Sequence, residues 1–366
     1  MGRCAVGKPV LLILSHAVEE YDQVRLLSSL GYDVFSLGGY IDPAHPHDPK
    51  RPALPDAPQH PDLKAAVDAL GFQDNIGAAA AHVPDAIFEW LGDDGIIIAH
   101  HYLENRIYPQ AARLRDWMNG SSGRRLIRRT VGQSVAHNEE QAQLAIDFGL
   151  RMETVRYSPN ERHIPGYTGE DALIRFYKDP AEYTGWTGDA AHVLGFGQHY
   201  IQRAPWTNPQ FWLDATDGLP RLLAGSGSDE HGGLGEVSPA ELLRRLRRTR
   251  VYLYTGTQPA SYTLGLIEAM MTGLPIVSIG PGHMGIFGDY SPLLFEGHLL
   301  APGPLYAFGG HDVRYDPDDV SHVRAEVERH LNDYEYAAKR SAWFRHRAVE
   351  MFGMNEIGRQ WAAFLG

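Results

Sequence analysis

Cysteine is almost absent from this chain of 366 residues, which contains only Cys4. A single thiol excludes a disulfide framework and a zinc site built from several cysteines, and it is typical of proteins from a reducing compartment. Long apolar runs are also absent at the start of the chain, where PVLLIL (9–14) has six residues and leads into the polar SHAVEEYD (15–22). We therefore expect neither a signal peptide nor a membrane span, and a cytoplasmic protein.

Basic charge is scarce too, since 33 lysines and arginines face 45 aspartates and glutamates, for a formal net charge of −12. This balance argues against a general nucleic-acid binder, because clustered lysines and arginines make the phosphate contacts. Two stretches differ: residues 106–129 hold seven arginines and one aspartate, and ELLRRLRRTR (241–250) holds five arginines and one glutamate. The second predicts an amphipathic helix with its leucines turned inward. The first is either a basic surface or a set of arginines that pair with the surplus acids.

The order of apolar segments indicates an α/β fold with two doubly wound domains. A chain of this length exceeds a single core, so two domains are expected. Short apolar strands such as PVLLIL and GIIIAHH alternate with helix-like segments, and the alternation begins again with HVLGFG and RVYLYTG. This pattern is typical of parallel sheets with crossover helices. We place the first domain at 1–170 and the second at 171–345.

The stretch TQPASYTLGLIEAMMTGLPIVSIG predicts a helix followed by a strand. The helix is expected over Leu264–Thr272, with Ser261 or Thr263 as its N-cap and Gly273 just past its end. Its residues are apolar on nearly every side, which is typical of a buried helix. PIVSIG is the expected strand.

One charged residue, Glu268, interrupts this apolar helix. A buried carboxylate is costly unless hydrogen bonds satisfy it, and the hydroxyl groups of a ribose or another sugar would do so. Alternatively, Glu268 lies at the rim of the helix or pairs with a nearby arginine. The stretch alone leaves both interpretations open.

With this order of segments, the second half resembles the donor-binding half of the GT-B glycosyltransferases and is most similar to the retaining enzymes of family 4. In that family a strand ends in Gly-Arg and a Lys follows five residues after the Arg; GFGQHYIQR has Gln198 and Arg203 at these places. A Gly-x-Gly turn (LLAGSGS) and a Gly-x-Val segment (GEV, 235–237) follow in the family's order. Of the family's two glutamates separated by seven residues, Glu268 matches the second, while Ala260 stands at the first.

The resemblance implies two Rossmann-like domains that face a cleft, and an enzyme that moves a sugar from a UDP- or GDP-linked donor to a hydroxyl group. In the family the second glutamate holds the ribose hydroxyls, and positive groups stabilise the departing diphosphate. The expected catalytic residues are His101, Arg203 and Lys178. For Lys178 the alternative is an ion pair with Asp171, Asp179 or Glu182. The expected donor-binding residues are Gly197, Gln198, Arg203, Val237, Ser261, Tyr262, Thr263, Leu264 and Glu268.

The first half resembles the acceptor domain through LLSSLGYDVFSL and DDGIIIAHH, and the resemblance places the closing helix at 346–366 against it. The expected acceptor-side residues are Ser15, His16, His100, Gln133, Ser134, Arg124 and Arg128. A surface loop at His16 and a structural role for His100 are the alternatives. A basic surface over 106–129 would suit an anionic acceptor: a phosphorylated sugar or lipid, an acidic glycan, or DNA with hydroxymethylated bases, as in phage enzymes.

We expect no metal ion and no cofactor, because the nucleotide sugar is itself a substrate and the chain has no Cys/His ligand set. Retention of the anomeric configuration is implied by the resemblance alone. Two other functions stay open. Since Gln198 and Ala260 replace two polar donor contacts of the family, one is the binding of a nucleotide sugar or glycan without turnover. The other is epimerisation of a nucleotide sugar.

Overall fold

The structure is a computed structural model, and it describes residues 7–14, 16–37, 54, 57–71, 82–100, 103–104, 107–132, 135–183, 185–204, 206–258, 260–279, 283 and 318–366. Four predicted site residues, Ser15, His101, Gln133 and Ser134, lie outside the described residues. The chain forms two compact units, each with its own parallel sheet. The predicted α/β fold with two doubly wound domains is confirmed.

The chain passes between the two units four times. The first unit comprises Met1–Ser158, Ile164–Tyr177 and Ile357–Gly366, and the second comprises Pro159–His163 and Lys178–Glu356. The long segment of the second unit begins after Tyr177, where the sequence suggested 170, and the chain returns to the first unit at Ile357, where it suggested 346. The last ten residues, Ile357–Gly366, form the third segment of the first unit.

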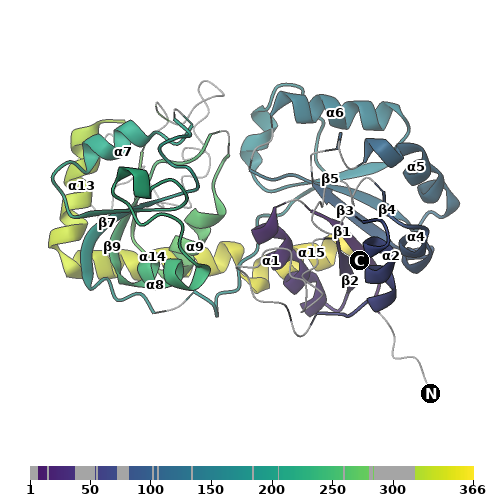
Figure 1. The fold of residues 1–366 in the computed structure, drawn as a ribbon, viewed down its shortest axis with the longest axis horizontal. Coiled ribbons are helices and arrows are strands. Elements are labelled where there is room, and N and C mark those ends of the chain that lie inside the picture. The colour runs from purple at the N-terminus through teal and green to yellow at the C-terminus, as the bar shows by residue number, and fades with distance from the viewer. Residues whose placement is uncertain are drawn as a thin grey trace, which may run out of the picture. The chain divides into compact units, whose positions relative to one another are not determined.

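The sheet of the first unit has six parallel strands in the order β2-β1-β3-β4-β5-β6 (Figure 1). Its strands are β1 (Pro9–Ile13), β2 (Asp33–Ser36), β3 (Ile96–His100), β4 (Arg125–Arg129), β5 (Met152–Arg156) and β6 (Ala172–Leu173). The central strands β1 and β3 are apolar and buried, since helices cover both faces of such a sheet.

Helices lie along both faces of this sheet (Figure 1). They are α1 (Ala17–Ser29), α2 (Pro61–Asp68), α4 (Asp85–Leu91), the 3-10 turn η1 (Tyr108–Gln110), α5 (Ala111–Gly120), α6 (Ala136–Asp147) and α15 (Met354–Leu365). The strand order runs outward in two directions from β1 and β3, so right-handed crossovers place α4, α5 and α6 on one face and α1 on the other. Arg125 at the start of β4 ties α15 to this unit, because its guanidinium donates to the carbonyl oxygen of Phe364 at 2.9 Å.

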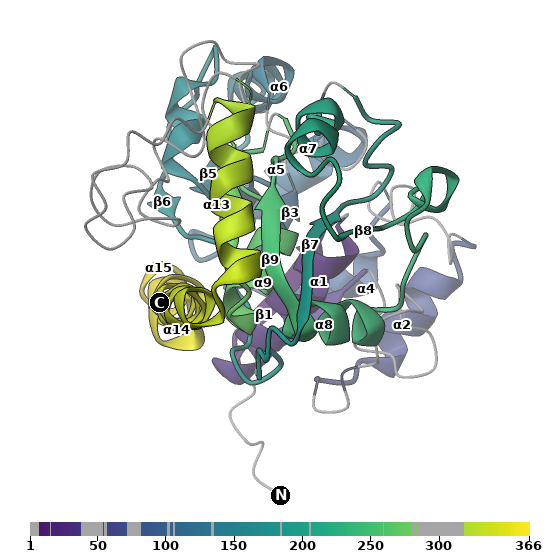
Figure 2. The same ribbon diagram turned by 90° about the vertical axis from the view of Figure 1, so that its left-hand side faces the viewer.

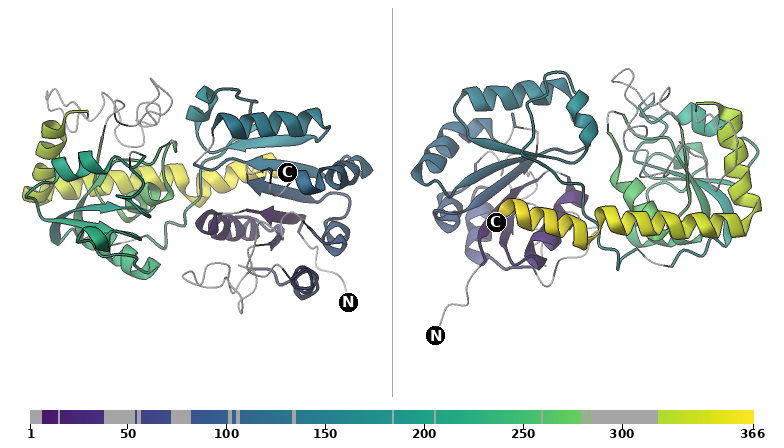
Figure 3. Two further views of the ribbon diagram at one scale, coloured as in Figure 1. Left: turned by 45° about the horizontal axis from the view of Figure 1, so that its top comes forward. Right: turned by 180° about the vertical axis from the view of Figure 1, so that it is seen from behind.

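The sheet of the second unit has four parallel strands in the order β10-β9-β7-β8 (Figure 2). They are β7 (Ala190–Phe196), β8 (Arg221–Ala224), β9 (Thr249–Tyr254) and β10 (Ile276–Ser278). The helices are η2 (Pro159–His163), α7 (Pro209–Ala215), η3 (Asp229–His231), α8 (Pro239–Arg248), α9 (Leu264–Thr272), α13 (Val320–Asn332) and α14 (Tyr334–Phe352). Helix α13 packs against β7, β9 and α7, while the long α14, yellow in Figure 3, packs against α9.

Helix α9 has the bounds that the sequence predicts, Leu264–Thr272. The Thr263 hydroxyl caps it by accepting a hydrogen bond from the Leu266 N–H at 3.2 Å. Gly273 follows at φ 88°, a left-handed conformation that a side chain would strain. Every residue from Leu266 to Thr272 is buried, Glu268 included. The prediction that this carboxylate is buried is confirmed.

A second buried acid, Glu139 at the first turn of α6, joins three elements of the first unit. Its carboxylate accepts hydrogen bonds from Arg128 of β4 at 2.6 Å and from Arg156 of β5 at 2.7 and 3.0 Å. The hydroxyl of Thr168 donates to the same group at 2.8 Å, and all three charged side chains are fully buried. Burial alone would raise the pKa of Glu139, but the hydrogen bonds from Arg156 and Arg128 hold that pKa well below its usual range.

The α13–α14 hairpin of the second unit contains a fully buried histidine, His330. Burial lowers the pKa of His330 to about 3, although its Nδ1 donates to the carbonyl oxygen of Glu326 at 2.8 Å. Arg340 and Arg329 lower this pKa further, and Asp333 raises it. The folded hairpin therefore holds a neutral imidazole.

His330 should make the second unit sensitive to acid. The unfolded chain takes up the proton near the ordinary pKa of about 6.5, whereas the folded unit resists it down to about 3, so stability falls as the pH drops between these values. Between pH 6.5 and 5 the expected loss is about 2 kcal/mol. Urea unfolding of wild type and His330→Gln at both pH values measures it. His346→Gln, at an exposed position, is the control, and equal pH slopes for all three proteins would contradict the prediction.

Candidate donor-binding site

The loops that follow β7 and β8 are joined at the carboxyl edge of the second sheet. The N–H of Gly197 donates to the Ala224 carbonyl oxygen at 3.1 Å, and the N–H of His199 donates to the Ser226 carbonyl oxygen at 2.8 Å. The Gln198 side chain adds to this link, since its Oε1 accepts from the Ser226 N–H at 3.2 Å. Gln198, at the family's arginine position, thus fastens one loop to the next.

The Gly-x-Gly turn after β8 needs both of its glycines. Gly225 and Gly227 have φ values of 119° and 77°, and a Cβ on Gly225 would lie 2.1 Å from the carbonyl oxygen of Gly197. The N–H of Gly225 donates to the carbonyl oxygen of Gly235, which begins the predicted GEV segment, at 2.9 Å. The structure therefore brings the first three donor motifs together at one edge of the sheet, and Val237 follows them half-buried.

The turn after Gln198 carries an unusual backbone and a cation. His199 has φ 51°, which is uncommon for a residue other than glycine. Its carbonyl oxygen accepts from the N–H of Arg203 at 2.9 Å, so the turn brings Arg203 back beside the strand end. Arg203 is half-exposed, and within the described part of the chain its guanidinium has no acidic partner.

The amino end of α9 lies beside the end of β7. A Cβ on Gly265 would come within 2.5 Å of the Phe196 ring, so the glycine allows the strand end and the first turn of the helix to meet. Thr263 and Leu264 at this end are half-buried, and Ser261 and Tyr262 are buried. A helix amino end attracts phosphate through its N–H groups and its dipole, and the carboxyl edge of a parallel sheet is the usual ligand side.

Glu268 lies one turn further along the same helix and has two partners on the segment just before β7. The ammonium group of Lys178 donates to Glu268 Oε1 at 2.8 Å, and the Tyr183 hydroxyl donates to the same oxygen at 3.3 Å. The Lys178 side chain is fully buried, while that of Glu268 keeps 10% of its surface exposed. Of the interpretations of Glu268 open from the sequence, the structure thus contains an ion pair, with a lysine in place of an arginine.

This pair corrects the prediction for Lys178. A cation that meets a departing diphosphate has to reach the ligand, but the ammonium group of Lys178 is buried and bonded to Glu268. The acid that Lys178 meets at 2.8 Å is Glu268 of α9, which was not among the predicted alternatives Asp171, Asp179 and Glu182. Tyr183 was not among the predicted site residues. The only signal in the sequence that pointed to it is the number of aromatic residues in the surrounding segment.

The position of the family's first glutamate is buried and apolar here. Ala260 is 6% exposed, and its N–H donates to the Thr257 carbonyl oxygen at 2.8 Å in a turn that leads to α9. A methyl group at this place offers a ligand no polar contact. Any contact to the transferred sugar must come from other residues.

In the first unit, two predicted acceptor-side histidines are described. His16 is exposed and forms the N-cap of α1, where its Nδ1 accepts from the Glu19 N–H at 3.5 Å. His100 ends β3 at the carboxyl edge of the sheet and is fully buried. The exposure of His16 therefore suits a ligand contact, and the burial of His100 suits a structural role.

Of the two interpretations of residues 106–129 that the sequence leaves open, the structure has the second for the described arginines, which pair with acids. Arg128 is fully buried against Glu139. Arg124 donates to Asp93 at 2.9 Å and to the carbonyl oxygens of Gly92 and Trp117 at 2.7 Å, and its side chain is 17% exposed. The remaining pairs are Arg113–Asp85, Arg115–Asp116, Arg125–Glu153 and Arg129–Glu19. These arginines hold the first unit together and offer little free charge to an anion.

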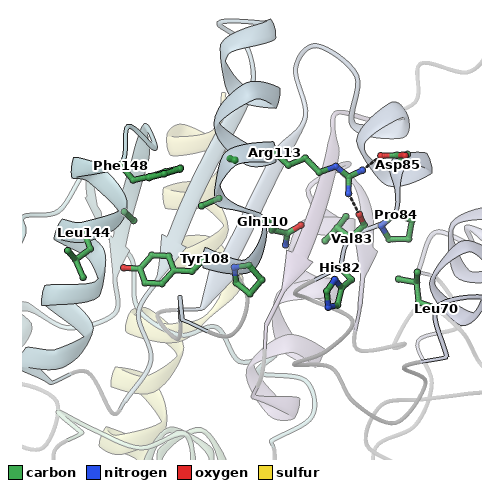
Figure 4. A pocket seen from close by; sticks show the side chains of 14 residues that line it. Leu70, His82, Val83, Pro84, Asp85, Tyr108, Gln110, Arg113, Leu144 and Phe148 are labelled. Atoms are coloured by element: carbon green, nitrogen blue, oxygen red, sulfur yellow. Dashed lines mark hydrogen bonds and ion pairs between the residues drawn. The ribbon is translucent and has the colours of Figure 1, made fainter.

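An open hollow of about 880 Å³ lies in the first unit beside α4, α5 and α6 (Figure 4). Its lining is largely apolar and includes Leu70, Leu144 and Phe148, and Arg113 and Asp85 pair with each other at one side (Figure 4). None of the predicted site residues lines it. The hollow is therefore separate from the residues considered for the donor.

Solved structures resemble the chain over its whole length. Sucrose-phosphate synthase from Thermosynechococcus elongatus matches with a TM-score of 0.61, at 14% identity over 97% of this chain and 98% of that one. HepE from Anabaena, in complex with UDP and glucose, matches with a TM-score of 0.60, at 14% identity over 98% and 99%. A glycosyltransferase from Rickettsia africae matches with a TM-score of 0.59, at 9% identity over 99% and 98%. The chain has the GT-B fold.

At these identities the likeness establishes the fold alone. No protein-family model matches the sequence, and no curated protein matches it. Among the described helices, none is long and apolar enough to cross a membrane. The described residues contain no group of three or more His, Cys, Asp and Glu side chains placed to hold a metal ion.

Proposed function

We propose that the protein transfers a sugar from a nucleoside-diphosphate donor to a hydroxyl group. The observation that carries the proposal is the carboxyl edge of the second sheet. Three features lie there: Arg203, two linked loops that contain glycines, and the amino end of α9. Among the described residues Arg203 has no acidic partner. A cation and a helix amino end suit a diphosphate. The GT-B fold supports the same reaction class.

In this proposal each part of the edge has one task. Arg203 and the N–H groups at Tyr262, Thr263 and Leu264 stabilise the diphosphate as it departs, because most of the developing negative charge lies there. Glu268 accepts hydrogen bonds from the ribose hydroxyls, and Gly197, Gln198 and Val237 frame the nucleotide. Ser261 supports the start of α9. No protein nucleophile or metal ion is required, and we propose retention of configuration from the resemblance to family 4.

The donor is proposed to be UDP-linked, since a solved structure with the same fold, HepE, is described in complex with UDP-glucose. On the acceptor side, the exposed His16 remains a proposed contact, and His101 remains a proposed catalytic residue. The acceptor class stays a hydroxyl compound. The buried and paired arginines give no support to DNA or another anionic acceptor.

Binding without turnover is the second candidate, and two positions favour it. Ala260 offers no carboxylate, and the Oε1 of Gln198 already accepts from Ser226. Release of UDP from UDP-glucose during incubation with an acceptor panel separates the candidates. Steady release supports transfer, whereas binding of UDP without release supports the second candidate. A change in the donor sugar with no acceptor would indicate an epimerase.

The nucleotide is expected to stabilise the protein through Glu268. A ligand that binds only the folded state at 100 times its Kd adds about 2.7 kcal/mol, so UDP should raise the melting midpoint. Glu268→Gln keeps the volume but removes the charge, and charge-assisted hydrogen bonds contribute about 1.5–3 kcal/mol. UDP affinity should therefore fall about 10- to 100-fold by titration calorimetry. The control is Glu335→Gln, an exposed position on α14. Equal UDP affinities for Glu268→Gln and wild type would remove Glu268 from the site.

A further inference from the structure

The segment 178–183, which leads into the second unit, is fixed against helix α9. Besides the two hydrogen bonds to Glu268, the backbone N–H of Lys178 donates to the carbonyl oxygen of Phe352, the last residue of α14, at 3.0 Å. Tyr183 is 6% exposed and its ring lies 5.9 Å from the Lys178 ammonium nitrogen. Lys178 and Tyr183, which both donate to Glu268, thus belong to one short buried stretch of chain.

Arg345 of α14 holds the other end of this segment. Its guanidinium donates to the carbonyl oxygens of Tyr183 and Met271, and to that of Pro180 at 3.2 Å. Met271 is in the last turn of α9, so one arginine ties the segment and the helix to each other. The positions of the Lys178 and Tyr183 side chains relative to Glu268 are therefore set by backbone contacts at both ends.

Glu268 sits where the buried pair meets the donor-binding edge. It is one turn from Gly265, whose surface contacts Phe196 at the end of β7, and residues three apart lie on neighbouring parts of a helix surface. Lys178 approaches the carboxylate from the buried side with no exposed surface, while Glu268 keeps a small exposed fraction. The geometry leaves the carboxylate, and not the ammonium group, within reach of a ligand.

We propose that Lys178 and Tyr183 are positioning residues, which orient the Glu268 carboxylate so that it selects a ribose over a deoxyribose nucleotide. This inference rests on the proposed function. An ionised carboxylate only accepts hydrogen bonds, so the ligand must supply the donors, and the vicinal hydroxyls of ribose are two such donors. Lys178 and Tyr183 both donate to Oε1, and these hydrogen bonds orient the carboxylate. Lys178 acts through Glu268 and does not touch the diphosphate.

Burial of the pair agrees with a task beyond stability. A buried ion pair is often no more stabilising than apolar side chains of the same volume, because both charges lose their hydration. Helix α9 is otherwise apolar, so leucine or methionine at both positions would suit the packing. Orienting the Glu268 carboxylate at the donor-binding edge would be a function of the Lys178–Glu268 pair that apolar packing could not replace.

The test compares UDP with 2′,3′-dideoxyuridine diphosphate in wild type and two variants. Lys178→Met removes the ammonium group at similar length, and Tyr183→Phe removes one hydroxyl and keeps the ring, so it serves if the first variant is unstable. Selectivity is the Kd of the dideoxy compound divided by the Kd of UDP. This ratio should fall about 10-fold in Lys178→Met, which loses a charged hydrogen bond to Glu268, and about 3-fold in Tyr183→Phe, which loses a neutral one. Lys339→Met, at an exposed position of α14, should leave the ratio unchanged.

Each outcome separates one role from the others. Combining Lys178→Met with Glu268→Gln should add little to the effect of Glu268→Gln on this ratio, because both act through one group. Equal weakening of UDP and the dideoxy compound would assign Lys178 to the diphosphate and overturn the inference. A lower melting midpoint with an unchanged ratio would make the pair structural only and also overturn it. If wild type binds UDP and the variants keep its ratio, the proposed function stands and this inference fails; if wild type binds neither nucleotide, both fail.

Discussion

Replacement of Glu139 by glutamine is expected to destabilise the first unit by about 3–5 kcal/mol, as measured for other buried ion pairs that lose one partner. Glu139 is the acid between Arg128 and Arg156, and all three side chains are fully buried. With glutamine, two buried guanidinium groups lose the carboxylate that they share. Chemical unfolding, followed by a signal from the first unit, measures the loss.

Glu140→Gln is the matched control, because it makes the same change one residue further along α6 at a side chain that is 71% exposed. We expect a change within about 0.5 kcal/mol there, as is usual for surface substitutions. A loss below about 1 kcal/mol in Glu139→Gln would mean that water or a local rearrangement compensates the two arginines. In that case the network would not hold β4, β5 and α6 together.

The pairs made by the arginines of 106–129 show why the sequence leaves their role open. Their number is a local property, but their partners are distant: Arg129 and Glu19 are 110 positions apart, and Arg125 and Glu153 are 28 apart. Only the strand order brings these acids within reach. A count of charges in one window therefore predicts a basic surface where the fold has neutralised it.

Helix α9 was predictable for the opposite reason. Its cap Thr263, its glycine Gly273 and its apolar pattern are all contained in about ten consecutive residues, and the structure has the predicted bounds. The burial of Glu268 followed from that pattern as well. Its partner did not, since Lys178 is 90 positions away and comes from the crossover between the units. Local signals thus placed the helix, while the identity of the group that meets Glu268 needed the tertiary structure.

The order of the donor motifs was likewise predictable, but not how they are connected. In the sequence, Gly225 is one glycine of a Gly-x-Gly turn. The structure shows why a glycine is needed there: the carbonyl oxygen of Gly197 leaves no room for a Cβ. Gln198 lacks the positive charge of the family's arginine, but its Oε1 accepts a hydrogen bond from the Ser226 N–H. In the proposed function, Arg203 therefore does alone what the arginine and lysine of the family do together.

Arg203→Ala should therefore remove most of the activity on a nucleoside-diphosphate sugar. Loss of one preorganised group that stabilises developing charge typically lowers kcat by 10²- to 10³-fold, or about 2.7–4 kcal/mol in the activation free energy. The effect should be large here because Gln198 supplies no second charge beside it. Release of UDP from UDP-glucose, measured at saturating donor, gives kcat, and the UDP titration gives the accompanying loss of binding.

Two further variants show whether charge or packing is responsible. Arg203→Lys keeps a positive charge at the same place and should recover part of the rate, although an ammonium group lacks the forked geometry of a guanidinium. Arg248→Ala removes an arginine of the same unit that is half-exposed and paired with Asp189, and it should leave kcat within about 2-fold of wild type. If Arg203→Ala retained more than about a third of the wild-type kcat, the diphosphate charge would have to be met elsewhere. The amino end of α9 would then be the next positive group to test among the described residues, since the ammonium group of Lys178 is buried against Glu268.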